Sequence, residues 1–250
     1  MLAACGFVVA LDAAMALVNG SITSRFGAKP LPELELRNGI TAPLRTLVVV
    51  PIMLTTQDAL ARHLERLEIH HLASPDGDVS FVLLSDWTDA AAEQVDGDDV
   101  LVENAVEGIR RLNRQYGPTP TGARFLLLHR RRQWNPAQAA WMGWERKRGK
   151  LHELNRLLRG AADTSFIPLD GQSPTVPAGV RYVVTLDADT RLPRDAVRRL
   201  VGKMAHPLNA PRFDGHSGRV LEGYAVLQPR IASSLPLGFE GSHYQRLVSG

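Results

Sequence analysis

The chain is poor in cysteine, and its clustered histidines have no thiol partners. Cys5 is the only cysteine among 250 residues, so an intramolecular disulfide is excluded and the composition is compatible with a reducing compartment. Without further cysteines, His63, His70 and His71 do not match the ligand patterns of a zinc site. We therefore interpret these histidines as ordinary helix and loop residues.

A complete P-loop is also missing. Five residues rather than four separate Gly143 from Gly149, and Leu151 stands where a P-loop has the Ser or Thr that binds magnesium. Lys150 can still bring a cation to the start of a helix, where backbone amides also attract anions. A simple helix start is the alternative interpretation of this segment.

The amino-terminal segment lacks basic residues ahead of its apolar run. Residues 1–18 are apolar except for Asp12, which is close to the shortest length that spans a bilayer. A signal peptide is not predicted without preceding Lys or Arg, and a carboxylate in the middle opposes a self-sufficient span. We predict a membrane-associated or interfacial segment over residues 1–24, with a buried core helix as the alternative. The Pro-punctuated residues 25–43 are predicted to be a linker.

Charge is unevenly distributed along the chain. Residues 86–109 hold eight acids and no Lys or Arg, whereas residues 124–159 hold ten Lys or Arg against two acids. This asymmetry indicates an anionic partner near the second segment. No nucleic-acid docking motif accompanies the basic residues, so nucleic acid is not the predicted partner.

Apolar runs and helical spacing alternate through the rest of the chain. Buried strands are predicted at 44–50, 79–84, 125–128 and 180–186, the first of them ending at Pro51. Apolar residues at helical spacing follow each strand, with a capping box at Thr55 and Asp58, a helix marked by the leucines of 151–158, and a first-turn proline at Pro193. Such alternation predicts a largely parallel sheet whose ligands bind at the carboxyl ends of its strands.

Two carboxylates follow the last predicted strand, in Leu186-Asp187-Ala188-Asp189-Thr190. Side chains two residues apart in an extended segment point the same way, so Asp187 and Asp189 can hold one hard divalent cation through oxygen. Ala188 is small enough to let a ribose or phosphate approach the backbone. The alternative is a surface turn after a buried strand, because Asp-x-Asp is common by chance.

Polar residues also follow the second and third predicted strands. Asp86, in Ser85-Asp86-Trp87-Thr88-Asp89, can accept hydrogen bonds from a base or ribose, or this segment can cap the next helix. The residues Arg130-Arg131-Arg132 are either a solvated face or a source of phosphate contacts. The tryptophans Trp134, Trp141 and Trp144 either stack on a sugar or base or pack a lid onto the core.

These motifs, taken in order, resemble those of A-type nucleotide-sugar glycosyltransferases. The motifs are Val48-Val49-Val50-Pro51, Ser85 to Asp89, Gly149-Lys150 with Asn155, and Leu186 to Asp189. Longer segments resemble the cyclic β-1,2-glucan synthase family over residues 44–250, namely 72–78, 141–155, 205–209 and 222–230. The resemblance implies a three-layer α/β/α fold of the GT-A type with a mostly parallel central sheet, truncated at its carboxyl end, in a glycosyltransferase domain over residues 44–250.

The resemblance also implies the reaction and its location. The family consists of processive, inverting glucosyltransferases of the bacterial inner membrane that use UDP-glucose to extend a β-1,2-glucan acceptor into a cyclic product, with the catalytic domain on the cytoplasmic side. In this sequence Asp187 and Asp189 would bind the Mg²⁺ or Mn²⁺ that bridges the diphosphate. Asp86 would contact the uridine side and Pro51 would shape the turn near the base. Lys150, with Arg148, would neutralise charge on the leaving group.

An inverting transfer also needs a general base. The resemblance places that carboxylate in a later acidic motif, which has no match before Gly250, so we expect the base beyond this residue and the chain to be a fragment that is inactive alone. Two alternatives stay open. One is another membrane polysaccharide synthase of related fold, and the other is a non-catalytic module that binds anions or membranes.

Overall fold

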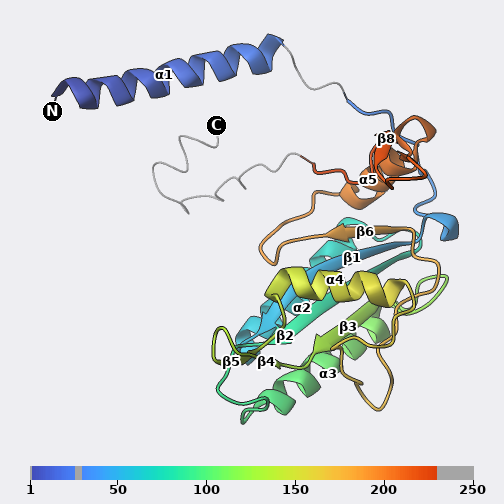
Figure 1. Cartoon of the computed structure of the whole chain (residues 1–250). Helices are drawn as coiled ribbons and strands as arrows, with labels where there is room; N and C mark the ends of the chain where they lie inside the picture. The colour runs from blue at the N-terminus through green and yellow to red at the C-terminus, as the bar shows by residue number, and fades with distance from the viewer. Residues whose placement is uncertain (1, 26–29, 230–250) are drawn as a thin grey trace.

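The computed structural model describes residues 2–25 and 30–229 of the chain (Figure 1). The helices are α1 (Leu2–Arg25), α2 (Gln57–Ala73), α3 (Asp98–Tyr116), α4 (Arg146–Leu158) and α5 (Ala196–Ala205), with short 3₁₀ helices η1 (Ala42–Leu44) and η2 (Pro207–Asn209). The strands are β1 (Thr46–Leu54), β2 (Val79–Trp87), β3 (Phe125–Arg130), β4 (Gln133–Asn135), β5 (Ala140–Met142), β6 (Tyr182–Thr185), β7 (Arg212–Phe213) and β8 (Val220–Glu222).

A four-stranded parallel sheet forms the centre of the fold. Its strand order is β3-β2-β1-β6, and each neighbouring pair is parallel. The pairs β4-β5 and β7-β8 are short and antiparallel. The predicted α/β fold with a mostly parallel sheet is thus confirmed.

Helices cover both faces of this sheet because alternate strand residues point in opposite directions. Val48 and Val50 pack with the apolar residues of α2, α3 and α5, whereas Leu47 and Val49 pack with Leu154 of α4. The chain passes from β1 to β3 in one direction and then crosses back past β1 to reach β6. Since parallel crossovers are almost always right-handed, this reversal places α4 on the opposite face from α2 and α3. Figure 1 shows α4 crossing in front of the strands.

The first strand does not end at Pro51, which corrects the prediction from sequence. β1 continues to Leu54, paired with β2 over its whole length. Pairing with β6 ends earlier: Val49 O accepts the last bond from that side, from Leu186 N. The backbone groups of residue 51 point to the same side as those of residue 49, toward β6, but β6 has already ended at that level. The missing N–H of Pro51 therefore costs no ladder bond.

Other boundaries also differ from those predicted. β2 extends through Asp86 and Trp87, and β3 extends through His129 and Arg130, because these polar side chains are buried with partners. The last central strand is shorter than predicted, at Tyr182–Thr185. The β4-β5 hairpin was not predicted, since strands of three residues carry too little alternation to be recognised.

Helix starts were predicted less well than helix ends. The cap of α2 is Thr56, whose hydroxyl accepts from Ala59 N, so the predicted capping box at Thr55 and Asp58 is wrong. α5 begins at Ala196, after Pro193 rather than around it. In contrast, α2 ends at the predicted Ser74 region and α3 at Gly117.

The amino-terminal part contains one long helix and an extended segment. In α1 the apolar side chains Phe7, Leu11 and Met15 are exposed, which does not match the alternative of a buried core helix. Within the described part of the chain, no helix has the length and apolar character needed to cross a membrane. In the range predicted to be a linker, Ile40 is buried in the core and Leu34 N donates to Gly202 O of α5.

Candidate ligand site at the carboxyl edge of the sheet

A cavity of about 380 Å³ opens at the carboxyl edge of the central sheet. It is lined by the ends of β1 and β2, by Gly143 and the first residues of α4, and by Ala188 in the turn after β6. The strand order reverses between β1 and β6: the chain runs outward from β1 through β2 to β3 and then returns to the other side of β1 as β6. Such a switch point is where open parallel sheets bind their ligands.

A buried cluster of four charged side chains forms one wall of this site. Arg130 of β3 donates to both oxygens of Asp86, at 2.7 and 2.9 Å, and to Glu153 Oε2 of α4 at 3.1 Å. Its remaining donors reach the carbonyl oxygens of Trp144 and Arg146, both at 3.1 Å. These bonds satisfy all five N–H groups of the guanidinium. A buried arginine is tolerated here because two carboxylates and two carbonyls surround it.

Lys150 supplies the second cation of the cluster. Its Nζ lies 3.0 Å from Asp86 Oδ2 and donates to Ile52 O at 2.6 Å. Burial lowers the pKa of Lys150, and the carboxylate of Asp86 opposes that shift. The four side chains carry two positive and two negative charges, so the cluster is balanced before any ligand arrives.

Two glycines allow the segment before α4 to approach this cluster closely. A Cβ on Gly143 would lie 2.5 Å from Asp86 Oδ2 and 2.9 Å from Arg130 Nη2. A Cβ on Gly149 would lie 1.9 Å from Trp144 O. Both positions therefore require glycine for lack of space rather than for an unusual backbone conformation.

The predicted metal-binding pair lies in the turn after β6. Thr190 N donates to Asp187 O at 3.0 Å, and Arg66 of α2 holds the turn through Ala188 O at 2.5 Å. The Asp187 carboxylate is exposed and forms an ion pair with Lys147, which lines the cavity. Asp189 is exposed in the same turn. Among the described residues there is no group of three or more His, Cys, Asp or Glu side chains placed to hold a metal.

Of the site residues predicted from sequence, four reach the cavity or its rim, whereas Arg148 and Asp189 do not line it. Pro51, Asp86 and Lys150 line the cavity, and Asp187 reaches its rim through Lys147. Arg148 does not line it: its side chain is 78% exposed and pairs with Glu145 at 3.0 Å. Successive residues of a helix point about 100° apart, so Lys147 and Arg148 cannot share one face.

Two of the three arginines after the predicted third strand are buried, in contrast to both interpretations from sequence. Arg130 is fully buried in the charge cluster, and Arg132 is buried against Asp98 and over the ring of Trp87. Neither the solvated face nor the phosphate contact predicted for this run applies to these two residues. Only Arg131, between them, is exposed.

Two cations and one carboxylate at the site, Arg146, Lys147 and Glu153, were not given a role by the sequence prediction. Lys147 and Arg146 line the cavity, and Arg146 pairs with Asp89 at 2.5 Å. Glu153 anchors Arg130 and also accepts from Ser165 N at 3.0 Å. The spacing Arg146 to Lys150 to Glu153 places these residues on one side of a helix, a signal that could have been read once the helix start was known.

The histidines near the site are structural. His129 is buried, its Nδ1 lies 2.8 Å from Ser85 Oγ, and its ring packs edge-on against Trp87. Burial lowers the pKa of His129 to about 3, so this imidazole is neutral at physiological pH. His63 lines the cavity, and burial followed by the charge of Arg66 lowers its pKa.

The fold and the site together define an α/β protein with a cation-rimmed cavity at the switch point of a parallel sheet. No family model matches the chain. The chain is 48% identical over 243 residues, 96% of its length, to the cyclic beta-(1,2)-glucan synthase NdvB of Rhizobium meliloti (strain 1021). It spans only 8% of the length of that protein. The resemblance to the cyclic β-1,2-glucan synthases predicted from the sequence is thus confirmed, and it concerns one segment of such a protein.

Proposed function

We propose that the chain is the donor-binding part of a processive, inverting glucosyltransferase that uses UDP-glucose to synthesise cyclic β-1,2-glucan on a GT-A type fold. One observation carries this proposal: a single cavity at the switch point brings together Asp86, Lys150 and the turn that holds Asp187 and Asp189. The similarity to a glucan synthase supports the choice of donor and product. The growing glucan acceptor and a bacterial inner-membrane location, with this domain on the cytoplasmic side, belong to the same proposal.

The residues after β6 suit a divalent cation bound together with a diphosphate. Magnesium is usually held by one or two carboxylates plus substrate phosphates rather than by a cage of protein ligands. Asp187 and Asp189 are two exposed carboxylates in one turn at the rim of the cavity. They would hold Mg²⁺ or Mn²⁺, which when bound would stabilise negative charge on the departing UDP.

Lys147 is the cation best placed to meet the phosphates. It lines the cavity and is half-exposed, and its only ion pair among residues 2–25 and 30–229 is with Asp187. A cation bound at Asp187 would compete with the Lys147 ammonium for the same carboxylate. Lys147 would then be free to neutralise a phosphate oxygen, the role that sequence reasoning gave to Lys150 and Arg148.

Asp86 and Lys150 lie deeper, where they would form the nucleoside side of the site. Arg130 takes one position on each oxygen of Asp86 and Lys150 takes another, whereas a carboxylate offers about four acceptor positions. One acceptor position therefore remains for an imide or ribose donor. Pro51 contributes to the wall of the cavity as part of β1 rather than as a turn.

The non-catalytic alternative has lost part of its basis. It rested on the positive surplus of residues 124–159, but Arg130, Arg132 and Lys150 are buried and paired with carboxylates. The surface of this segment is therefore much less basic than its sequence. A related synthase with another sugar nucleotide or linkage remains the competing enzyme.

Calorimetric titration with UDP-glucose tests the proposal. We expect binding that requires Mg²⁺ or Mn²⁺, that is lost in the double variant Asp187→Asn with Asp189→Asn, and that exceeds the binding of UDP-N-acetylglucosamine and GDP-mannose. Lys147→Ala should weaken binding about tenfold, consistent with loss of one charge-assisted contact, whereas the adjacent Arg148→Ala should leave it unchanged. Equal binding with and without metal in folded protein would contradict the role of the carboxylate pair.

A further inference from the structure

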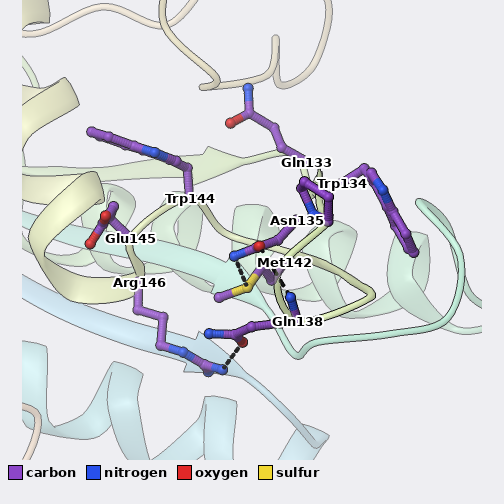
Figure 2. A pocket seen from close by; sticks show the side chains of 9 residues that line it. Gln133, Trp134, Asn135, Gln138, Met142, Trp144, Glu145 and Arg146 are labelled. Atoms are coloured by element: carbon purple, nitrogen blue, oxygen red, sulfur yellow. Dashed lines mark hydrogen bonds between the residues drawn. The ribbon is translucent and has the colours of Figure 1, made fainter.

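A second cavity, of about 410 Å³, lies beside the first. It is lined by the β4-β5 hairpin and by the segment 144–146 that leads into α4 (Figure 2). Its volume falls within the range of small-molecule sites, roughly 300–1,000 Å³. Arg146 lines both cavities, so whatever occupies the second cavity lies next to the proposed donor.

The hairpin that forms this cavity is held firmly in place. Trp141 of β5 exchanges two backbone hydrogen bonds with Ala90, just beyond β2, at 2.8 and 2.9 Å. Asn135 Oδ1 accepts from the backbone N–H of Ala137 and of Gln138, which fixes the turn between the strands. Asn135 Nδ2 also lies 3.3 Å from Met142 Sδ, a contact drawn in Figure 2. The cavity is therefore a preformed feature of the carboxyl edge.

Two tryptophans that line this cavity are about half-exposed. Trp134 is 50% exposed and Trp144 is 44% exposed, whereas Trp87 is buried and Trp141 is half-buried. They lie at opposite ends of the cavity with Met142 and Asn135 between them (Figure 2). Each indole packs on one side only, Trp134 against Trp141 at 6.0 Å and Trp144 against His152 at 5.9 Å between ring centroids, so the remaining flat apolar surface is open to a ligand.

The polar side chains that line this cavity carry no net charge once their ion pairs are counted. Glu145 is paired with Arg148 at 3.0 Å, and Arg146 is paired with Asp89 at 2.5 Å. The other polar groups are carboxamides. Gln138 accepts from Arg146 at 3.4 Å, while the Gln133 side chain has no hydrogen-bond partner within the described ranges. Carboxamides both donate and accept, so they suit hydroxyl groups better than phosphates.

We infer that this cavity is a saccharide-binding subsite, in which Trp134 and Trp144 stack on pyranose rings and Gln133 and Gln138 bond their hydroxyls. A pyranose combines an apolar C–H face with a rim of hydroxyls, which matches indole surfaces beside carboxamides. The separation of the indoles to the two ends of the cavity suits a chain of sugars better than a single ring. Identification of that chain as the glucan acceptor rests on the proposed function, whereas saccharide binding itself does not.

The backbone beside Arg146 supports a functional role for this boundary between the two cavities. Glu145 and Arg146 have φ values of 50° and 48°, in the left-handed region that non-glycine residues seldom adopt. Two such residues in succession are costly and are typical of binding and catalytic segments. Here they turn the chain so that Arg146 lies between the cavities.

Titration of the full chain with a short linear β-1,2-gluco-oligosaccharide, followed by tryptophan fluorescence and calorimetry without nucleotide, tests the inference. We expect saturable binding, a loss on the order of tenfold or more in Trp134→Ala and in Trp144→Ala, and a smaller loss in Trp134→Phe, which keeps a flat ring. Sorbitol, which has hydroxyls but no ring face, should not bind. Phe213→Ala, which removes an exposed aromatic side chain from β7, serves as the matched control and should bind normally.

UDP-glucose binding measured on the same variants separates this inference from the proposed function. Trp134→Ala should bind UDP-glucose like the parent chain, because Trp134 does not line the first cavity. Absence of oligosaccharide binding in the folded parent chain, or unchanged binding in the Trp134→Ala, Trp144→Ala double variant, would overturn the inference. Oligosaccharide binding without UDP-glucose binding would uphold the subsite while refuting the proposed donor.

Discussion

Replacement of Arg130 by methionine should destabilise the fold severely. Methionine has a similar length and fills the buried space, but it removes five hydrogen bonds and leaves Asp86 and Glu153 without their shared cation. Breaking a buried ion pair from one side costs about 3–5 kcal/mol. Lys150 still compensates Asp86, and Ser165 still donates to Glu153, so we expect a value within that range rather than above it.

Urea unfolding followed by circular dichroism measures this effect. Against a total stability of roughly 5–15 kcal/mol, Arg130→Met should shift the midpoint clearly and lower Tm by roughly 6–20 °C. Arg110→Met is a matched control, because Arg110 pairs with Asp170 at 2.5 Å but is half-exposed, and should cost less than about 1 kcal/mol. Equal destabilisation in the two variants would refute the argument that burial makes the Arg130 cluster essential.

Two further predictions concern the stability of the folded chain. Gly143→Ala should lower the free energy of unfolding by about 1–3 kcal/mol, because the new Cβ would lie 2.5 Å from Asp86 Oδ2. Gly122→Ala is the control, since a Cβ on Gly122 meets nothing within 4 Å. A urea midpoint that moves no more in Gly143→Ala than in Gly122→Ala would contradict the prediction. Burial lowers the pKa of His71 to about 4. Between pH 6.5 and 4 the unfolded chain therefore binds more protons at this residue than the folded chain does. The contribution of His71 should lower the free energy of unfolding by about 2 kcal/mol from pH 7 to pH 5. In His71→Phe the new ring would pack against Phe81 and Phe125, and this part of the pH dependence should disappear when urea unfolding is measured at a series of pH values. An unchanged dependence of the free energy of unfolding on pH would contradict the role of His71.

The sheet could be predicted from the sequence because its strands are apolar and β-branched. The run Leu47 to Val50 is buried on both faces, so it reads as a continuous apolar segment rather than as an alternating one. The predicted strand ends are wrong where a strand continues past its apolar run. Pro51 lies within β1 because its neighbour has already ended, and that depends on the length of a strand more than a hundred residues later.

The candidate site could be predicted only in part, for a related reason. Asp187 stands out because an exposed pair of carboxylates after a strand is a local pattern. Asp86 and Arg130 lie 44 residues apart, and each looks like a surface residue until the parallel register of β2 and β3 places them opposite one another. The choice of Lys147 over Arg148 depends on the helical phase of α4, which the sequence leaves undefined because no side chain caps its start.

We propose that the carboxyl-edge cavity holds the diphosphate of a sugar nucleotide beside the turn after β6. A crystal structure of the full chain with UDP and Mn²⁺, with anomalous scattering used to locate the metal, tests it directly. We expect a manganese peak in contact with Asp187 and Asp189, with the UDP phosphates near Lys147 and the nucleoside toward Asp86. Clear UDP density elsewhere on the molecule, or manganese bound away from this turn, would show that this cavity is not the donor site.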